Sequence, residues 1–425
     1  MIDIKLIRDN PDLVKDNLKK KFAEEKILFV DKILKKDTEW RKLKTGNDKL
    51  RYERNKISNE IAKAKKEKSN TKKLMETAKS IPKKISENEI KINKINKNIQ
   101  EYMVQIPNLI SKETPIGKDD SKNVELRKVG KPKKFSFKIK NHIELAENLG
   151  LIDFDSSAKS SGNGFYYLKK ELALLNQSLI RFAIDFMQKK KYDYIETPLM
   201  LNRKAIFASM DKESLKNSVY SIDGEDLNLI GTAEQSLLAM HANEAIPYNK
   251  LPKKYCSYSM CFRKEVGSHG INEKGLWRTH QFNKIEQFVF CLPEDSEKIY
   301  EEMLKISEEI MKSLKLPYRV LEICSGDLAD WKYRSADIDV FRPTTNDYGE
   351  VASLSNCTDY QARNLNIKYI HKNGERKVLH TLNNTALATS RILVAIIENY
   401  QQKDGSIKIP DVLIPYMNGL KEIKK

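Results

Sequence analysis

Apolar residues recur at alternating spacings of three and four between Val30 and Tyr102, and this repeat restricts the fold more than any other feature of the sequence. Such spacing places them on one stripe of a helix and forms a heptad seam. The repeat has two halves separated by the polar residues 65–73, so the simplest arrangement is an antiparallel hairpin of two helices. The seam residues are Ile33, Trp40, Leu43, Leu50, Ile57, Ile61 and Ala64 in the first half, interrupted by Asn47 and Arg54, and Leu74, Ala78, Ile81, Ile85, Ile92, Ile95, Ile99 and Tyr102 in the second, interrupted by Asn88.

Pro82 lies inside the second half of this repeat. A proline in a helix interior removes one backbone hydrogen bond, and its ring clashes with the preceding turn. We therefore expect a bend or an interruption of the second helix at this residue.

The basic charge of the chain is concentrated in the same region. The chain has a formal charge of +18, and residues 30–100 hold 22 Lys and Arg against 10 Asp and Glu, a net +12. The apolar seams of the two helices pack against each other, so the basic outer faces stay free. About 35 residues per helix would make a rod of roughly 50 Å. Two interpretations remain open: a solvated rod or dimerisation device, or a surface that binds RNA through phosphate contacts and shape.

The five cysteines form no Cys-x-x-Cys pair, and the six histidines show no metal-ligand spacing. We expect reduced thiols, no structural zinc and a cytoplasmic location. The amino-terminal residues mix acids with bases and lack the apolar segment of a signal peptide, and no run reaches the about eighteen apolar residues that a membrane span needs. We therefore expect no membrane association.

The composition changes near residue 105, where Pro, Gly, Ser and Lys clusters begin. We expect a helical hairpin domain over residues 1–105 and a second domain over 106–425. The second domain is expected to contain a short helix over 142–149, with His142 at the surface. An amphipathic helix follows over 166–191, and then a strand that ends at a turn around Pro198.

The segment 255–290 predicts a strand, a loop of about ten residues and a second strand. Residues two apart on a strand share a face. We therefore expect Arg263 and Glu265 to lie on one face, and likewise Phe282 and Glu286. A guanidinium, carboxylates and an aromatic ring on one surface suit a nucleotide together with a small amine. The alternative is an ordinary ion pair across two neighbouring strands.

A resemblance to a known family rests on the ordered series TAE, FRKE, HQFNKIE, GEVAS and LNNTALATSR, which lies between residues 232 and 391. The sequences FRKE, GLWRTHQF and KIEQF between residues 262 and 288 resemble motif 2 of the class II aminoacyl-tRNA synthetases, in the form found in seryl-tRNA synthetases. The helix and strand before Pro198 resemble motif 1, and the stretch 380–391 resembles motif 3, in which we expect a turn before a helix. The resemblance implies an α+β fold, in which an antiparallel sheet with flanking helices forms the catalytic domain, and it implies a homodimer.

The resemblance also implies a serine site. The TAE triplet, Thr232, Ala233 and Glu234, would hold the α-amino group, while Glu286 and Thr385 would bind the hydroxyl group of the side chain. From spacing alone, Thr232 with Glu234 is equally an N-terminal helix cap. Asn384 stands where many members of the family carry glycine.

For ATP, the resemblance implies a second set of residues around Arg263, which would bridge the serine carboxylate and the α-phosphate and is the expected catalytic residue. Phe282 and Arg391 would sandwich the adenine. Glu350 and Ser353 would hold Mg²⁺ with ATP; they are three apart, so a bulge or a strand end is required to aim both at one site. The full ATP set is Arg263, Lys264, Glu265, Thr279, Phe282, Glu350, Val351, Ala352, Ser353 and Arg391. Asp337 and Asp339 are expected to be structural.

The implied reaction joins L-serine to ATP as seryl-adenylate and then transfers serine to the 3′ end of serine tRNA, and of selenocysteine tRNA where one is present. The resemblance places the long variable arm of the tRNA on the hairpin. Two other classes of protein remain as alternatives: a ligase that loads a protein carrier, and an RNA-binding scaffold without catalysis. The basic hairpin argues against the first, and the site residues argue against the second.

Overall fold

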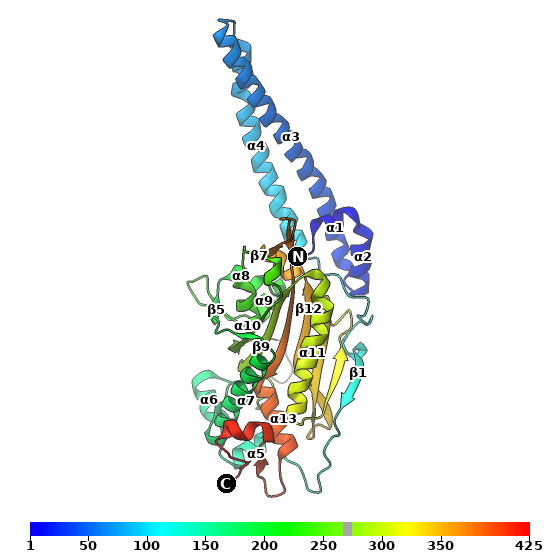
Figure 1. Ribbon diagram of the computed structural model, residues 1–425, viewed down its shortest axis with the longest axis vertical. Coiled ribbons are helices and arrows are strands. Elements are labelled where there is room, and N and C mark those ends of the chain that lie inside the picture. Colours follow the sequence, from blue (N-terminus) through cyan, green and yellow to red (C-terminus); the bar gives the residue numbers. More distant parts are fainter. Residues whose placement is uncertain (267–273) are drawn as a thin grey trace. The chain divides into compact units, whose positions relative to one another are not determined.

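The computed structural model describes residues 1–266 and 274–425. It divides into two compact units, Ile2–Pro107 and Asn108–Lys425, with Met1 belonging to the second (Figure 1). Among the described residues, no helix combines the length and the apolar composition needed to cross a membrane.

The first unit consists of two short helices followed by two long ones. These are α1 (Ile4–Asp9), α2 (Pro11–Lys20), α3 (Ile27–Lys66) and α4 (Lys72–Met103). The long pair forms the antiparallel hairpin expected from the heptad repeat (Figure 1). The two asparagines that interrupt the seams meet: Asn88 Nδ2 donates to Asn47 Oδ1 at 3.1 Å. A paired polar layer of this kind fixes the register of two packed helices.

Helix α4 continues through Pro82 without a break, so the predicted interruption is wrong. The flanking seam residues Ile81 and Ile85 are buried against α3, with 3% and 7% of their surface exposed. Packing of the apolar stripe supplies most of the stability of a helix in a protein, and here it outweighs the one hydrogen bond lost at proline.

The second unit is built on an eight-stranded sheet. Its strands run in the order β1 (Val124–Val129), β10 (Tyr318–Glu322), β11 (Arg334–Arg342), β12 (Asp347–Thr358), β15 (His380–Ala388), β9 (Gln281–Cys291), β8 (Lys253–Phe262) and β4 (Asp193–Tyr194). Every pair is antiparallel except β4 with β8. The α+β fold with an antiparallel sheet is therefore confirmed.

Three helices, α7 (Lys170–Lys189), α11 (Ser296–Ser313) and α13 (Thr389–Tyr400), pack against this sheet and enclose the main apolar core with it (Figure 1). The remaining helices are α5 (His142–Asn148), α6 (Phe154–Ser161), α8 (Arg203–Phe207), α9 (Lys212–Ser218), α10 (Ala233–Ala239) and α12 (Tyr360–Asn364). The short strands are β2 (Ile152–Asp153), β3 (Tyr167–Leu168), β5 (Met200–Leu201), β6 (Asn228–Leu229), β7 (Ala245–Pro247), β13 (Lys368–Ile370), β14 (Arg376–Val378), β16 (Ile407–Lys408) and β17 (Glu422–Ile423).

Two local expectations in this unit are wrong. The residues before α13 form the nine-residue strand β15 and not a turn, because their asparagines are buried and hydrogen-bonded inside the sheet. His142 is buried and not at the surface: its Nδ1 lies 3.0 Å from Glu398 Oε1, and its Nε2 accepts a hydrogen bond from the Leu276 amide at 3.3 Å.

Strand β8 ends at Phe262, so Arg263 and Glu265 follow the strand and do not share a face of it. Glu265 has a positive φ of 49°, which turns the chain away from the strand direction. The loop expected after it includes residues 267–273, which lie outside the described residues.

Candidate active site

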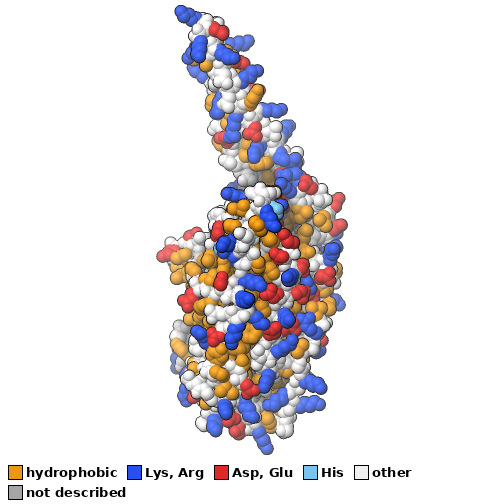
Figure 2. Space-filling model, viewed as in Figure 1, with side chains coloured by type: hydrophobic (Ala, Val, Ile, Leu, Met, Phe, Trp, Pro, Cys, Tyr) orange, Lys and Arg blue, Asp and Glu red, His pale blue; other side chains and the backbone are white. Residues whose placement is uncertain are grey.

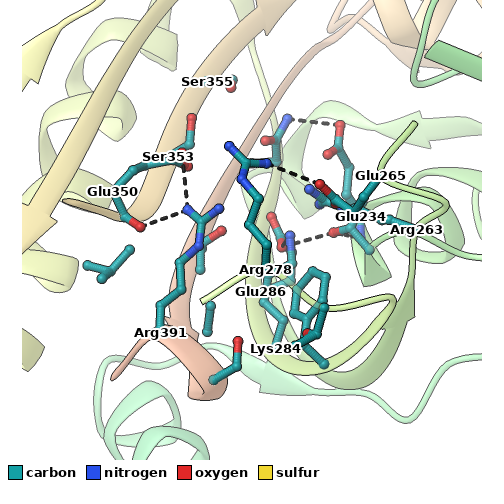
Figure 3. Close-up of a pocket in the computed structure, with 18 of the residues that line it drawn as sticks. Glu234, Arg263, Glu265, Arg278, Lys284, Glu286, Glu350, Ser353, Ser355 and Arg391 are labelled. Atoms are coloured by element: carbon teal, nitrogen blue, oxygen red, sulfur yellow. Dashed lines mark hydrogen bonds and ion pairs between the residues drawn. The ribbon is translucent and has the colours of Figure 1, made fainter. Parts of the chain in front are cut away.

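A cavity of about 350 Å³ lies where strands β9, β12 and β15 meet the start of α10 and the first turn of α13 (Figure 3). Its charged lining mixes five cations with four carboxylates. The cations are Arg263, Arg278, Lys284, Lys332 and Arg391, and the carboxylates are Glu234, Glu265, Glu286 and Glu350. Such a lining fits a ligand that carries both phosphate and ammonium groups.

Arg263 reaches into this cavity from the end of β8. Its Nε donates to the carbonyl oxygen of Gly231 at 3.2 Å, and its guanidinium lies 5.3 Å from the centre of the Phe282 ring. A Cβ at Gly231 would lie 3.6 Å from Arg263 Nε, which is an ordinary van der Waals contact, so the two residues pack closely without strain. The side chain is therefore fixed through one nitrogen and one ring face, while the rest of the guanidinium faces the cavity.

The start of α10 forms one wall of the site. Thr232 is its N-cap, since its hydroxyl accepts a hydrogen bond from the Glu234 amide at 3.3 Å. The same hydroxyl donates to Glu286 Oε2 at 3.0 Å. Thr232 therefore both caps the helix and lines the cavity, because its single hydroxyl caps α10 and also orients a buried carboxylate.

Glu286 is almost fully buried on β9 and is held by a second partner on the same strand. Lys284 Nζ lies 2.5 Å from Glu286 Oε2, and both side chains are less than a tenth exposed. Both donors bind Oε2, so among the described residues no side chain donates a hydrogen bond to Oε1. This oxygen is available to a ligand hydroxyl group in the cavity.

Glu234 is the second buried carboxylate in this part of the site. Its Oε1 accepts hydrogen bonds from Gln361 Nε2 at 2.6 Å and from Asn383 Nδ2 at 3.0 Å. Burial, followed by the charge of Glu286, raises the pKa of Glu234 to about 7. An incoming ammonium group would compensate these two neighbouring acids.

The other end of the cavity is shaped by a bulge in β12. Ile338 pairs with Ala352 and Asp339 with Glu350, so Val351 is the extra residue. The bulge lets Glu350 and Ser353 both line the cavity, as the spacing of the two residues required.

Arg391, in the first turn of α13, is tied to this bulge. Its Nη1 donates to the Glu350 carbonyl oxygen at 2.7 Å and lies 3.2 Å from Glu350 Oε2 (Figure 3). Burial would raise the pKa of Glu350, but the charge and the hydrogen bond of Arg391 outweigh burial and lower it. The Arg391 guanidinium lies over the ring of Trp277, at 5.4 Å from its centre.

Ser353 has a lysine and an aspartate as close neighbours. Lys332 Nζ donates to Ser353 Oγ at 3.2 Å. Asp337, opposite Ser353 on β11, is half-buried, and its buried Oδ1 atom has no hydrogen-bond partner among the described residues. Burial, followed by the charge of Glu350, raises the pKa of Asp337 to about 7.

The structure brings most of the expected site residues together. Those that line the cavity are Thr232, Glu234, Arg263, Glu265, Thr279, Phe282, Glu286, Glu350, Val351, Ser353, Thr385 and Arg391. Three do not: Ala233 and Ala352 are buried elsewhere, and Lys264 places its Nζ over the ring of Tyr220 at 5.8 Å. The Asn384 side chain points away from the cavity and donates to Met303 O and Ser307 Oγ on α11, so it does not narrow the site.

Several lining residues were not singled out from the sequence. They are Trp277, Arg278, Lys284, Trp331, Lys332, Ser355, Asn383, Ala388 and Ser390. Lys284 could have been found, because it lies between Phe282 and Glu286 at strand spacing and therefore shares their face. Lys332 lies in the loop before β11 and gave no comparable signal.

Comparisons with known proteins agree over the whole chain. The description "Seryl-tRNA synthetase N-terminal domain" matches residues 1–110, and "tRNA synthetase class II core domain (G, H, P, S and T)" matches 218–400. A serine–tRNA ligase of Methanocella arvoryzae is 44% identical over 422 residues, covering 99% of each chain.

Solved structures give the same result. The seryl-tRNA synthetase of Pyrococcus horikoshii complexed with ATP is 42% identical, with a TM-score of 0.94 over 100% of this chain and 99% of that one. The cytoplasmic serine–tRNA ligase of Naegleria fowleri in complex with AMP is 32% identical, with a TM-score of 0.90 over the same shares. With the motif 2 arginine, the TAE turn and the motif 3 helix gathered around one cavity, this chain belongs to the seryl-tRNA synthetase family of class II aminoacyl-tRNA synthetases.

Proposed function

We propose that this protein activates L-serine with ATP to seryl-adenylate and then transfers serine to the 3′ end of serine tRNA, both in the cavity around Arg263. Family membership supports serine–tRNA ligase activity. The observation that carries the assignment to this cavity is the convergence of Arg263 with the buried pair Thr232 and Glu286.

Serine binds at the end of the cavity formed by α10 and β9. Glu234 takes the ammonium group, and Glu286 with Thr385 takes the hydroxyl group. The Oε1 atom of Glu286 accepts a hydrogen bond from the serine hydroxyl group, since the other two donors bind Oε2. Alanine would leave this buried acceptor unpaired, and rejection of a ligand that lacks a hydroxyl can be large for this reason.

ATP binds at the opposite end. Arg263 contacts the serine carboxylate and the α-phosphate together, so it neutralises charge where the new bond forms. Phe282 and Arg391 hold the adenine, and Glu265 and Thr279 line the same region. Lys264, Val351 and Ala352 would contribute through their backbone. The serine carboxylate is already ionised, so the attack on the α-phosphate needs no general base.

The oxygen donors around the β12 bulge fit a magnesium ion that arrives with ATP. Glu350 and Ser353 would hold it, and the buried Oδ1 of Asp337 without a partner lies on the neighbouring strand. Among the described ranges, 1–266 and 274–425, no group of three His, Cys, Asp or Glu is arranged to hold a metal ion by itself. When bound, the ion neutralises phosphate charge.

The hairpin binds the variable arm of the tRNA, which gives residues 1–105 a tRNA-binding role and residues 106–425 the catalytic role. Figure 2 shows Lys and Arg side chains along the hairpin, with few acids between them. A surface of this kind binds phosphates with strong salt dependence and little base readout.

We further propose a homodimer and a cytoplasmic location. The partly exposed side chains of Tyr167 and Met260 lie near a groove of about 300 Å³ along α7 and β8, which offers a surface of mixed apolar and amide side chains to a second copy. Sedimentation equilibrium would show a species of twice the chain mass if this is right.

Serine-dependent exchange of pyrophosphate into ATP tests the activation step, and charging of serine tRNA tests the transfer step. We expect exchange with serine and Mg²⁺ and none with alanine. A protein that charges no serine tRNA, or that exchanges equally with alanine, would contradict the proposal. Loading of a carrier protein in place of tRNA would favour the carrier ligase.

A further inference from the structure

Two segments account for the net basic charge of the chain. Residues 30–100 hold a net +12 of the total +18. The 16 residues 125–140 supply the remaining +6, because they contain seven Lys and Arg and a single acid, Glu125. All other residues together are neutral. The second segment belongs to the unit that contains the active site.

Three of these seven cations are already neutralised by acids of the same unit. Arg127 binds Glu308 at 2.7 Å, a partner that is itself nearly buried. Lys128 binds Glu125 at 3.1 Å and Lys140 binds Glu144 at 3.3 Å. These pairs fix both ends of the segment on the protein.

The other four cations are exposed. No ion pair joins Lys131, Lys133, Lys134 or Lys138 to any acid among the described residues. Four unpaired lysines within eight residues repel one another, and a polyanion would relieve this repulsion while releasing its own counterions.

This stretch is neither helix nor strand, and two of its phenylalanines pack against each other. The rings of Phe135 and Phe137 are half-buried and meet edge to face at 5.3 Å. Lys133 Nζ lies over the Phe135 ring at 4.9 Å. The segment is anchored at its two ends, where β1 pairs with β10 and the backbone of Lys140 exchanges two hydrogen bonds with the Gln401 side chain, and this lowers the entropy lost on binding.

Both ends of the segment lead to walls of the active site. Lys128 Nζ lies 5.5 Å from the ring centre of Tyr348, two residues before Glu350. At the other end, His142 accepts a hydrogen bond from the amide of Leu276, the neighbour of the cavity residue Trp277. In Figure 1 the chain can be followed from β1 to α5 along this path, and Figure 2 shows Lys and Arg side chains in the same region.

We propose that Lys131, Lys133, Lys134 and Lys138 form a second tRNA-binding surface, on the catalytic unit, that contacts phosphates close to the end of the tRNA that enters the cavity. This rests on the proposed function. An RNA substrate whose terminus reaches the cavity must bring its adjoining phosphates past the cavity walls, where this segment lies. Contacts to phosphate position the RNA without reading its sequence.

The test replaces three cations in the full-length protein, Lys131→Gln, Lys133→Gln and Lys134→Gln together. We expect tRNA affinity, measured at about 0.1 M salt, to fall about tenfold, and the log–log salt slope of binding to flatten by about 2 to 3. Pyrophosphate exchange involves no tRNA and serves as the reference reaction. A matched control makes the same charge change on the same unit, at the exposed residues Lys403, Lys421 and Lys424.

The outcomes separate this proposal from the proposed function. Weaker, less salt-dependent tRNA binding in the triple variant, with normal binding in the control, supports the second surface. Wild-type binding and salt slope in the triple variant, or equal losses in the control, overturn it. Absence of serine-dependent exchange in the wild-type protein would instead refute the proposed function.

Discussion

The hairpin and the catalytic unit use charge in opposite ways. The hairpin keeps its seam largely apolar, with one asparagine pair in it, and displays its cations to solvent. In its active site the catalytic unit instead buries charged groups, and Glu286 and Lys284 are both less than a tenth exposed and bound to each other. Exposed cations bind an extended polyanion at little desolvation cost. Buried charged groups select a small ligand, because a ligand without the matching group leaves them unpaired.

The largest loss of activity should come from replacing Arg263, the arginine that reaches into the cavity from the end of β8. Arg263→Ala should lower serine-dependent pyrophosphate exchange by at least about 1,000-fold, because both the carboxylate and the phosphate lose a charge-assisted partner. Arg376→Ala, at an exposed arginine of β14, is the control and should keep full exchange. Near-normal exchange in Arg263→Ala would remove this residue from the chemistry.

Deleting residues 28–102 tests whether the two units divide the labour. We expect the shortened protein to lose charging of serine tRNA by on the order of 100-fold or more, because the basic phosphate-binding surface is gone. Pyrophosphate exchange should remain within a few-fold of the full chain. If both reactions disappear together, the contrast between the units is wrong.

Lys284→Met tests the buried pair on β9. Removing one partner of a buried ion pair leaves an uncompensated charge, which costs about 3 kcal/mol or more. We expect the KM for serine in the exchange reaction to rise by on the order of 100-fold, while the KM for ATP changes little. Lys254→Met removes the lysine of the Lys254–Glu302 pair, outside the cavity, and should change neither constant.

The pH dependence of stability should reveal Glu234. Burial and Glu286 raise its pKa from 4.5 to about 7. The folded protein then holds this proton more tightly than the unfolded chain, so the stabilisation is complete below about pH 4.5 and is lost as the pH rises through about 7. The unfolding temperature of Glu234→Gln minus that of wild type should therefore become more positive between about pH 5 and pH 8. Parallel curves for the two proteins would contradict the raised pKa.

The smallest effect on activity is expected at Pro82. Pro82→Ala restores a backbone hydrogen bond in α4 and should raise the stability of the hairpin by up to about 3 kcal/mol. Thermal unfolding followed by circular dichroism would measure the gain. Exchange should be unchanged, and a fall in exchange would show that the units are coupled.

Much of the architecture was predictable because it depends on periodic patterns. The heptad repeat predicted the hairpin, and strand spacing predicted that a bulge or a strand end must bring Glu350 and Ser353 together; the structure has a bulge. Strand parity failed for Arg263 and Glu265, since β8 ends one residue earlier and the chain turns at Glu265. Asparagines misled at β15, because burial and hydrogen bonds satisfied side chains that usually favour turns.

The sequence by itself determined the helical hairpin, the order of the synthetase motifs and the concentration of basic charge, since each is written in neighbouring residues. Tertiary structure alone decided that Thr232 donates to Glu286, that Asn384 turns toward α11, and that Lys332 meets Ser353. The physical reason is that such contacts join strands and loops distant in the chain. Their strength depends on burial, which only the assembled sheet and helices provide.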